Sequence, residues 1–397
     1  MQLIYINKGA SPTKFESYLQ KYNNKVQQQG QKYNQLLMEG FVHNGAEVIS
    51  ISSRPINRAI EKKLFFRKET DFENGIKYHY VSFINYPVLR NFTVLVNVFF
   101  KILFMKKKRN ETVVLCDALN IAASSAAWLA SKLSGLYSVA VVTDVPCHRP
   151  DNAKIPFHEK VNLWLMKKFD GYLLLTEQMS DIVNPKKRPY VVLEGHSDVS
   201  MAEVENSLEN KYEKKVCFYA GTLRKVYGIE YLVRGFIKAN IPDSELHIYG
   251  DGDFREELKK LAEEYSSVKY MGIAPNSVIV ENELKSTLLV NPRPTDADYT
   301  KYSFPSKNME YMASGTPVLT TRLPGMPAEY NDYVYLIEDE STEGVCAALE
   351  SVMKLSREEL HEKGGSAKAF VMENKNNCIQ AGKVLEMIKQ EVIKNGG

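Results

Sequence analysis

The residues best suited to chemistry gather in one stretch, 303–318, where Ser306, Lys307 and Glu310 follow one another at helical spacing. A lysine in the first turn of a helix opposes the helix dipole, so Lys307 is favourable there if an anion binds beside it. The ammonium and the free N–H groups of the helix start then converge on that anion. Glu310 lies one turn further on the same face, where its carboxylate can accept hydrogen bonds from sugar hydroxyls. The spacing predicts a phosphate site with a carboxylate one turn deeper, or else a capped amphipathic helix with a local Lys–Glu pair.

Three elements must hold these side chains in place. The apolar run 288–290 is typical of a buried strand, and it ends at Asn291 before a polar loop. Ser306 suits the N-cap of the helix, and Gly315 suits the position just past its end. The next strand begins at Thr316. The helix residues expected to face the core are Met309, Met312 and Ala313.

The stretch resembles the donor-site signature of retaining glycosyltransferases of family 4. Glu310 and the run 315–318 match the second half of that signature, whereas Tyr302 stands where the family has a first glutamate. The run 304–307, Phe-Pro-Ser-Lys, is similar to a subset of the family in which the lysine supplies the positive charge. The resemblance covers nearly the whole chain and is most specific over residues 216–330. It implies the α/β fold called GT-B, with two Rossmann-like domains facing a central cleft.

The resemblance also implies further donor-site residues. A strand ending at Gly221 leads through a short basic loop into a helix, a plausible phosphate site. The family has Arg and Lys where this chain has Thr222 and Tyr227, so Arg224 and Lys225 are the basic residues available for the diphosphate. Backbone near 271–273 would frame the nucleotide base, and residues 303–304 would contact the sugar. The expected donor-binding residues are Gly221, Thr222, Arg224, Lys225, Met271, Gly272, Ile273, Ser303, Phe304, Ser306, Lys307 and Glu310.

On the acceptor side, the segment after the apolar run 138–143 carries Asp144, His148 and Arg149. Ligands of open α/β sheets gather at the carboxyl ends of strands. The resemblance implies that Asp144 faces the reacting sugar or acts on the acceptor. His148 and Arg149 would then meet the acceptor, although a loop histidine more often makes a structural hydrogen bond.

Composition limits the class of protein. A chain of 397 residues is long for one domain and comfortable for two. Its five cysteines are widely spaced, with no C-x-x-C, which argues against a disulfide framework or a zinc site and indicates a reducing compartment. No metal-ligand cluster is recognisable in the sequence, so we expect neither a metal nor an organic cofactor. No nucleic-acid-binding module is recognisable.

Charge is divided unevenly along the chain. Residues 1–195 carry 27 Lys and Arg against 16 Asp and Glu, whereas the remainder carries 24 against 32. A basic first half favours an anionic partner or a membrane surface, unless the two domains have simply drifted in charge. The segment 88–109 is apolar, is interrupted by Asn97 and Lys101, and ends in a basic run. It is too interrupted to span a bilayer, so we expect either a helix lying on an anionic membrane or a core helix.

Two domains are expected. Residues 1–198 form the N-terminal Rossmann-like acceptor domain, and residues 199–377 form the C-terminal donor domain. The resemblance implies that a terminal helix, about 378–397, crosses back to the first domain.

The leading hypothesis is a retaining glycosyltransferase of the hexosyltransferase type, with UDP as the expected donor nucleotide. Its acceptor would be a lipid-linked glycan or a polysaccharide of the envelope, capsule or exopolysaccharide kind, and its place the cytoplasm or the inner face of a membrane. Lys307, Glu310 and Asp144 are the expected catalytic residues. One alternative is a nucleotide-sugar epimerase of the same fold. The other is a degenerate, non-catalytic transferase acting as a binding partner, which the departures at Tyr302, Thr222 and Tyr227 would favour.

Overall fold

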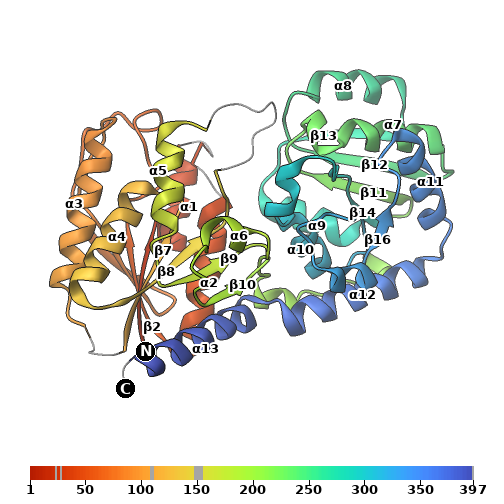
Figure 1. Cartoon of the computed structure of the whole chain (residues 1–397). Coiled ribbons are helices and arrows are strands. Elements are labelled where there is room, and N and C mark those ends of the chain that lie inside the picture. The colour runs from red at the N-terminus through yellow and green to blue at the C-terminus, as the bar shows by residue number, and fades with distance from the viewer. Residues whose placement is uncertain (23–24, 27–28, 108–110, 147–154, 396–397) are drawn as a thin grey trace. The chain divides into compact units, whose positions relative to one another are not determined.

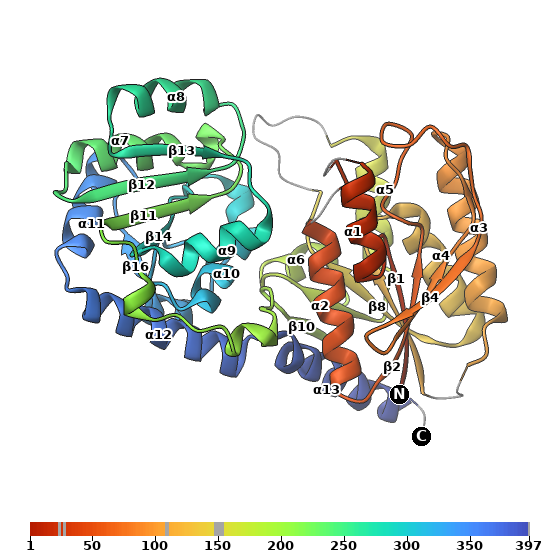
Figure 2. The same ribbon diagram turned by 180° about the vertical axis from the view of Figure 1, so that it is seen from behind.

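The structure is a computed structural model that describes residues 1–22, 25–26, 29–107, 111–146 and 155–395 (Figures 1 and 2). The chain divides into two compact units. Unit 1 comprises residues 1–196 and 377–397, and unit 2 comprises residues 197–376. Each unit is built around its own sheet.

Unit 1 contains an eight-stranded sheet in the order β10-β9-β8-β7-β1-β2-β5-β4, in which only β4 runs antiparallel to its neighbour. Central strand β1 is all buried, and it pairs in parallel with β2 and β7. A short antiparallel pair, β3-β6, lies apart from this sheet. The strands are β1 (Gln2–Asn7), β2 (Glu47–Ser52), β3 (Phe65–Phe66), β4 (Glu69–Glu73), β5 (Ile76–Tyr80), β6 (Phe83–Ile84), β7 (Thr112–Asp117), β8 (Tyr137–Val142), β9 (Gly171–Leu174) and β10 (Tyr190–Val192).

Helices cover both faces of this sheet, with α3 and α4 packed together on one face and α2 and α13 on the other (Figures 1 and 2). The last helix fits closely against α2: a Cβ on Gly40 would lie 2.2 Å from the Asn377 carbonyl oxygen. Asn44 Nδ2 also donates to Cys378 O at 2.8 Å. The helices are α1 (Pro12–Lys21), α2 (Gln29–His43), α3 (Leu89–Phe104), α4 (Ile121–Ser134), α5 (Phe157–Met166), α6 (Met179–Val183) and α13 (Asn377–Asn395).

Unit 2 contains a six-stranded, fully parallel sheet in the order β13-β12-β11-β14-β15-β16. Its central strands are nearly continuous apolar runs, as expected for a parallel sheet covered on both faces. The strands are β11 (Lys215–Ala220), β12 (Ser244–Tyr249), β13 (Val268–Gly272), β14 (Leu288–Asn291), β15 (Val318–Thr321) and β16 (Tyr335–Ile337). The helices are α7 (Ile229–Ala239), α8 (Arg255–Glu264), α9 (Asn276–Lys285), α10 (Ser306–Ser314), α11 (Thr342–Met353) and α12 (Arg357–Asn374).

The two ends of unit 2 meet. Ser197, its first residue, forms an isolated parallel β-bridge with Asn376, its last. The Ser197 N–H also donates to the Lys375 carbonyl at 3.2 Å. Unit 2 therefore starts and stops at one place.

The sequence does not predict α1, because residues 8–29 read only as a polar segment. Pro12 occupies the first turn of α1, where a missing N–H is harmless. Phe15 is the buried residue that fixes this helix to the core of unit 1. One aromatic anchor among polar residues is too weak a periodic signal to identify a helix.

The segment that includes α3 has features of both alternatives expected from the sequence, a core helix and a helix with an exposed apolar side. Val94, Val98 and Ile102 are buried, as in a core helix. Phe92 and Phe104 are exposed by 64% and 82%. In the described part of the chain no helix is long and apolar enough to cross a bilayer.

Candidate functional site

The candidate donor site lies at the carboxyl edge of the unit 2 sheet. Strands β11 and β14 are neighbours there, and α10 begins shortly after β14. Carboxyl ends of adjacent parallel strands are where open α/β sheets bind ligands. The helix starts with its N–H groups at this edge, so the sheet and the helix dipole favour an anion at the same place.

Lys307 lies at the centre of this edge. Its ammonium donates to the Ala220 carbonyl at the end of β11 and lies 5.7 Å from the centre of the Tyr219 ring. Burial lowers the pKa of Lys307, and the carboxylates of Glu310 and Glu283 oppose that shift. A mostly buried cation beside a helix N-terminus is a strong binding partner for an anion.

Gly221 leaves room for this lysine. A Cβ at position 221 would lie 2.4 Å from Lys307 Nζ, so a larger residue would displace the ammonium. The expected residues Gly221 and Lys307 are therefore in direct proximity. Thr222 follows them, and its carbonyl accepts a 3.0 Å hydrogen bond from the Tyr219 hydroxyl.

Tyr311 fixes the end of β11 from the helix side. Its hydroxyl accepts a 3.0 Å hydrogen bond from the Ala220 N–H, and its ring is buried. The partners expected to hold α10 against the core, Met309, Met312 and Ala313, are all buried. Gly315 ends the helix in the left-handed conformation, φ 78°, as the sequence predicts.

The prediction that Ser306 caps α10 is wrong. The helix begins at Ser306 itself, and the N-cap position is Pro305, whose backbone is extended. Pro305 has no side-chain acceptor, and α10 has no side-chain cap hydrogen bond. The first N–H groups of the helix are therefore uncapped by a side chain.

Gly250 packs backbone against backbone beside the site. Its φ is +135°, and a Cβ there would lie 1.8 Å from the Gly221 carbonyl oxygen. The Gly250 N–H donates to Gly272 O at 2.8 Å. This chain of contacts links Gly221 to the expected base-binding residues, of which Met271 and Ile273 are exposed by 46% and 77%.

The two expected basic residues of the loop after β11 are engaged by acids. Lys225 Nζ lies 2.7 Å from Glu257 and 3.1 Å from Glu230. Arg224 Nε lies 3.9 Å from Asp253, and its guanidinium faces the Tyr227 ring at 5.6 Å. Arg224 is thus the looser of the two, and Lys307 is the cation most embedded in the site.

Arg293 is a site residue that sequence reasoning missed. It lies two residues past the end of β14, and its Nη2 donates to Ser303 Oγ at 3.2 Å. Its guanidinium also faces the rings of Tyr227 and Tyr299 at 5.5 and 5.3 Å. Its Nε is buried and has no partner among the residues described. The available signal was a basic residue just after a buried strand.

The remaining donor residues differ in accessibility. Phe304 is buried against Tyr330, with ring centres 5.3 Å apart, so a role at a ligand falls to its backbone. Ser303 is partly accessible beside Arg293. Glu310 is exposed one turn beyond Lys307.

In the described residues no cluster of three His, Cys, Asp or Glu could hold a metal ion.

In unit 1, Asp144 lies just beyond β8, is exposed, and accepts the Val145 N–H at 2.7 Å. His148 and Arg149 lie outside the described residues. Sequence reasoning missed two further residues, Lys8 and Asp117. Lys8 follows β1, and Asp117 is the last residue of the neighbouring strand β7. Burial lowers the pKa of Lys8 and raises that of Asp117, and each charge partly offsets the shift of the other.

Comparisons with known proteins bear on both units. Residues 200–369 match the family model described as glycosyl transferases group 1. No curated protein sequence matches the chain significantly. The structure is similar to sucrose-phosphate synthase from Thermosynechococcus elongatus, with TM-score 0.70, 12% identity, and 99% and 100% of the two chains covered.

Two further solved structures are informative. HepE from Anabaena, in complex with UDP, has TM-score 0.66 and 12% identity, and 98% of this chain and 100% of HepE are covered. TarM from S. aureus, in complex with Fondaparinux, alpha-GlcNAc-glycerol and UDP, has TM-score 0.56 and 16% identity, covering 77% of this chain and 59% of TarM. These likenesses confirm the two-domain α/β fold of GT-B type. The family match shows that residues 200–369 form a domain of the glycosyl transferases group 1 type.

Proposed function

We propose that this chain is a retaining hexosyltransferase of family 4 type, which moves a sugar from a UDP-sugar to a lipid-linked glycan or a polysaccharide. The observation that carries the proposal is the position of Lys307, mostly buried at the start of α10 against the end of β11. The glycosyl transferase group 1 match over residues 200–369 supports the reaction class. The UDP bound in the structures of HepE and TarM supports the choice of nucleotide.

The leaving diphosphate gains negative charge as the sugar departs, so catalysis needs positive groups that are already in place. Lys307 and the uncapped N–H groups of α10 meet this need. The ammonium donates to the Ala220 carbonyl, and a phosphate oxygen would replace or join that acceptor. Arg293 adds a second cation beside Ser303.

Glu310 accepts hydrogen bonds from the ribose, and the open backbone at Gly272 lies against the base. Gly272 suits this role because nothing lies within 4 Å of where a Cβ would be. Asp144, exposed beyond β8, acts on the acceptor side or steadies the developing positive charge on the sugar. No metal takes part in the proposed reaction.

The same proposal places the enzyme in the cytoplasm, against the inner face of an anionic membrane. The exposed side of α3 presents Phe92, Phe100 and Phe104, and basic residues follow the helix. Aromatic rings that insert at the interface, next to lysines that meet lipid phosphates, are typical of helices lying on membranes. An acceptor on a lipid carrier would be presented at that surface.

A thermal-shift panel of UDP-, GDP-, dTDP- and ADP-sugars in the presence of EDTA tests the donor part of the proposal. Ligand binding raises the melting temperature by mass action, so we expect a shift with UDP-sugars that chelation leaves unchanged. Turnover of the responsive donor, followed by NMR of the product anomer, then tests retention. An absence of any shift, or an inverted product, would contradict the proposal.

A further inference from the structure

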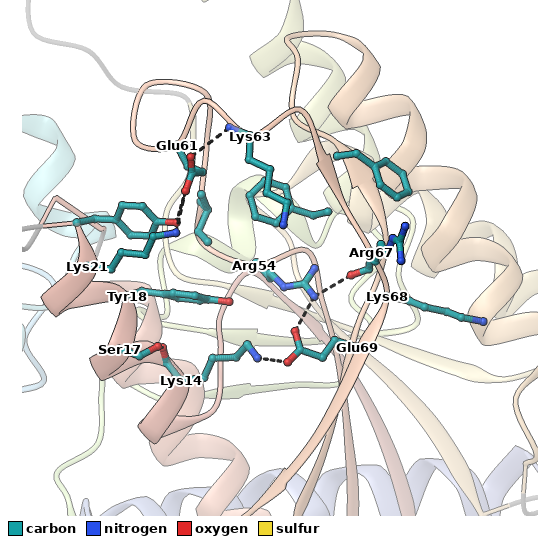
Figure 3. A pocket seen from close by; sticks show the side chains of 14 residues that line it. Lys14, Ser17, Tyr18, Lys21, Arg54, Glu61, Lys63, Arg67, Lys68 and Glu69 are labelled. Carbon is teal, nitrogen blue, oxygen red and sulfur yellow. Dashed lines mark hydrogen bonds and ion pairs between the residues drawn. The ribbon is translucent and has the colours of Figure 1, made fainter.

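Unit 1 contains a pocket of about 470 Å³ between α1 and the chain around β3 and β4 (Figure 3). Its size is in the range of pockets that hold small ligands or part of a longer one. The lining residues are Lys14, Ser17, Tyr18, Lys21, Tyr22, Arg54, Ile56, Glu61, Lys63, Phe65, Phe66, Arg67, Lys68 and Glu69. None of the roles assigned so far uses this pocket.

The charges of the lining are strongly unequal, with six cations and two carboxylates. Both carboxylates are already engaged. Glu69 contacts Lys14 and, at 3.0 Å, Arg54, while Glu61 lies 2.9 Å from Lys21. The Lys21 ammonium is the main reason why the pKa of Glu61 is lowered to about 2, so Glu61 is ionised at neutral pH. An excess of four positive charges therefore remains.

Lys63, Arg67 and Lys68 provide most of this excess. All three are exposed, and none forms an ion pair with a carboxylate of the described residues. Lys63 Nζ lies 5.6 Å from the centre of the Phe66 ring, at the wall of the pocket. Three cations without acidic partners in the lining of one pocket favour a ligand that carries negative charge.

The floor of the pocket is a buried arginine held in a fixed position. Arg54 has a side chain exposed by 5%, donates to Arg67 O at 2.9 Å, and lies 5.0 Å from the centre of the Tyr80 ring. Its backbone is left-handed, φ 52°, which is unusual for arginine and shows that the surroundings determine its conformation. The guanidinium is thus preorganised to meet an anion.

Aromatic side chains form the other wall. Tyr18 and Tyr22 lie on α1 with ring centres 6.2 Å apart, and Figure 3 shows the Tyr18 ring directed toward Arg54. Aromatic faces pack against the C–H faces of sugar rings, while their hydroxyls reach sugar oxygens. A lipid headgroup layer would need a convex or flat surface, which α3 provides, and a bare phosphate would need no such wall.

We propose that this pocket binds an acidic saccharide, a segment of the acceptor chain that carries carboxylate or phosphate groups. The inference rests on the proposed function, because it takes the acceptor of that reaction to be the ligand. Sugar rings lie against Tyr18 and Tyr22, and the anionic groups meet Lys63, Arg67 and Lys68, with Arg54 beneath. The pocket thereby selects acceptors that are negatively charged.

Direct binding tests this without turnover. Calorimetry at two salt concentrations would use oligogalacturonate as the carboxylate probe, oligo(glycerol phosphate) as the phosphate probe, maltohexaose as the neutral probe, and phosphatidylglycerol vesicles as the membrane probe. We expect one acidic probe to bind, the neutral probe not to bind, and affinity to fall as salt rises. The better acidic probe identifies the anionic group.

A triple variant, Lys63→Ala, Arg67→Ala and Lys68→Ala, should weaken acidic-probe binding by about tenfold or more. The matched control, Lys62→Ala, Lys77→Ala and Lys160→Ala, removes the same charge from unit 1 outside the lining, and we expect a change of about twofold or less. Tyr18→Leu in place of the triple variant should also weaken the acidic saccharide while sparing vesicle binding.

Three outcomes would overturn the inference: no acidic probe binds, both triple variants lose affinity equally, or only vesicles respond to the pocket variants. UDP-sugar binding measured on the same variants distinguishes a failure of the pocket inference from a failure of the proposed function. If the wild-type protein binds no UDP-sugar, the transferase proposal is wrong. The saccharide measurements would still show whether the pocket binds acidic saccharides.

Discussion

The two units present their ligand-facing surfaces in different ways. In unit 2 the site is built from backbone: Gly221, Gly250 and Gly272 bring strand ends together, and one lysine supplies a buried charge. In unit 1 the pocket is built from side chains, with many exposed cations around the buried Arg54. A backbone site suits a group of constant shape, such as a diphosphate. A side-chain site can change its ligand by single substitutions, so under the proposed function acceptor choice can vary while donor chemistry stays the same.

The largest expected effect is on the backbone-built side. Gly250→Ala would place a Cβ 1.8 Å from the Gly221 carbonyl oxygen at φ +135°. Steric overlap with backbone and the strained conformation together should cost about 4 kcal/mol of unfolding free energy in unit 2. Urea unfolding followed by far-UV circular dichroism measures this.

Gly272→Ala is the matched control for Gly250→Ala. Its φ of +73° is also left-handed, but nothing lies within 4 Å of the added Cβ. We expect a cost of about 1 kcal/mol, from conformation alone. Equal costs for the two variants would show that the contact between Gly250 and Gly221 does not matter.

Removal of the buried cation should have the next largest effect. Lys307→Ala leaves the growing charge of the diphosphate without its ammonium, so turnover should fall about 100-fold, or about 2.7 kcal/mol. Lys260→Ala, an exposed lysine on α8, is the control of equal charge. Normal turnover of Lys307→Ala would show that the donor phosphates bind elsewhere.

Acid should weaken unit 1 through a buried histidine. The His196 Nε2 donates to the Tyr33 carbonyl oxygen at 2.9 Å. The buried Nδ1 of the same ring has no partner within the described residues. Burial lowers the pKa of His196 to about 4, below the ordinary 6.5, so the unfolded chain binds the proton more readily between these values. Stability should fall by about 2 kcal/mol as pH drops through that window.

Both tryptophans, Trp128 and Trp164, lie in unit 1, so tryptophan fluorescence reports the unfolding of that unit. His196→Gln should flatten the acid dependence, while His158→Gln, which removes an imidazole whose side chain is 70% exposed, should not. An unchanged acid slope in His196→Gln would assign the effect to other groups.

The smallest expected effect separates two lysines of unit 2. Lys225 is exposed and paired with Glu230 and Glu257, so Lys225→Ala should change donor binding by about twofold or less. Calorimetry with a UDP-sugar compares it with Lys307→Ala. Similar losses in the two variants would mean that binding depends on net charge rather than on the position of Lys307.

Sequence reasoning predicted the elements that carry periodic signals. The parallel strands, the helix 306–314 and its end at Gly315 follow from apolar runs and from a glycine that takes positive φ. It could not foresee pairings between distant residues. Lys225 appears available in the sequence, but Glu257, 32 positions later, engages it. The pocket of unit 1 escaped notice for the same reason, because it depends on α1 meeting residues 54–69.

The pairing of Ser197 with Asn376 has an engineering consequence. A segment whose two ends are hydrogen-bonded to each other is an insertion, and its excision leaves one short gap rather than two loose ends. Residues 197–376 can therefore be treated as an exchangeable cassette. Under the proposed function, grafting a cassette of different nucleotide-sugar preference between His196 and Asn377 would change the sugar delivered, and the host sheet, with α13 in place, would keep its choice of acceptor.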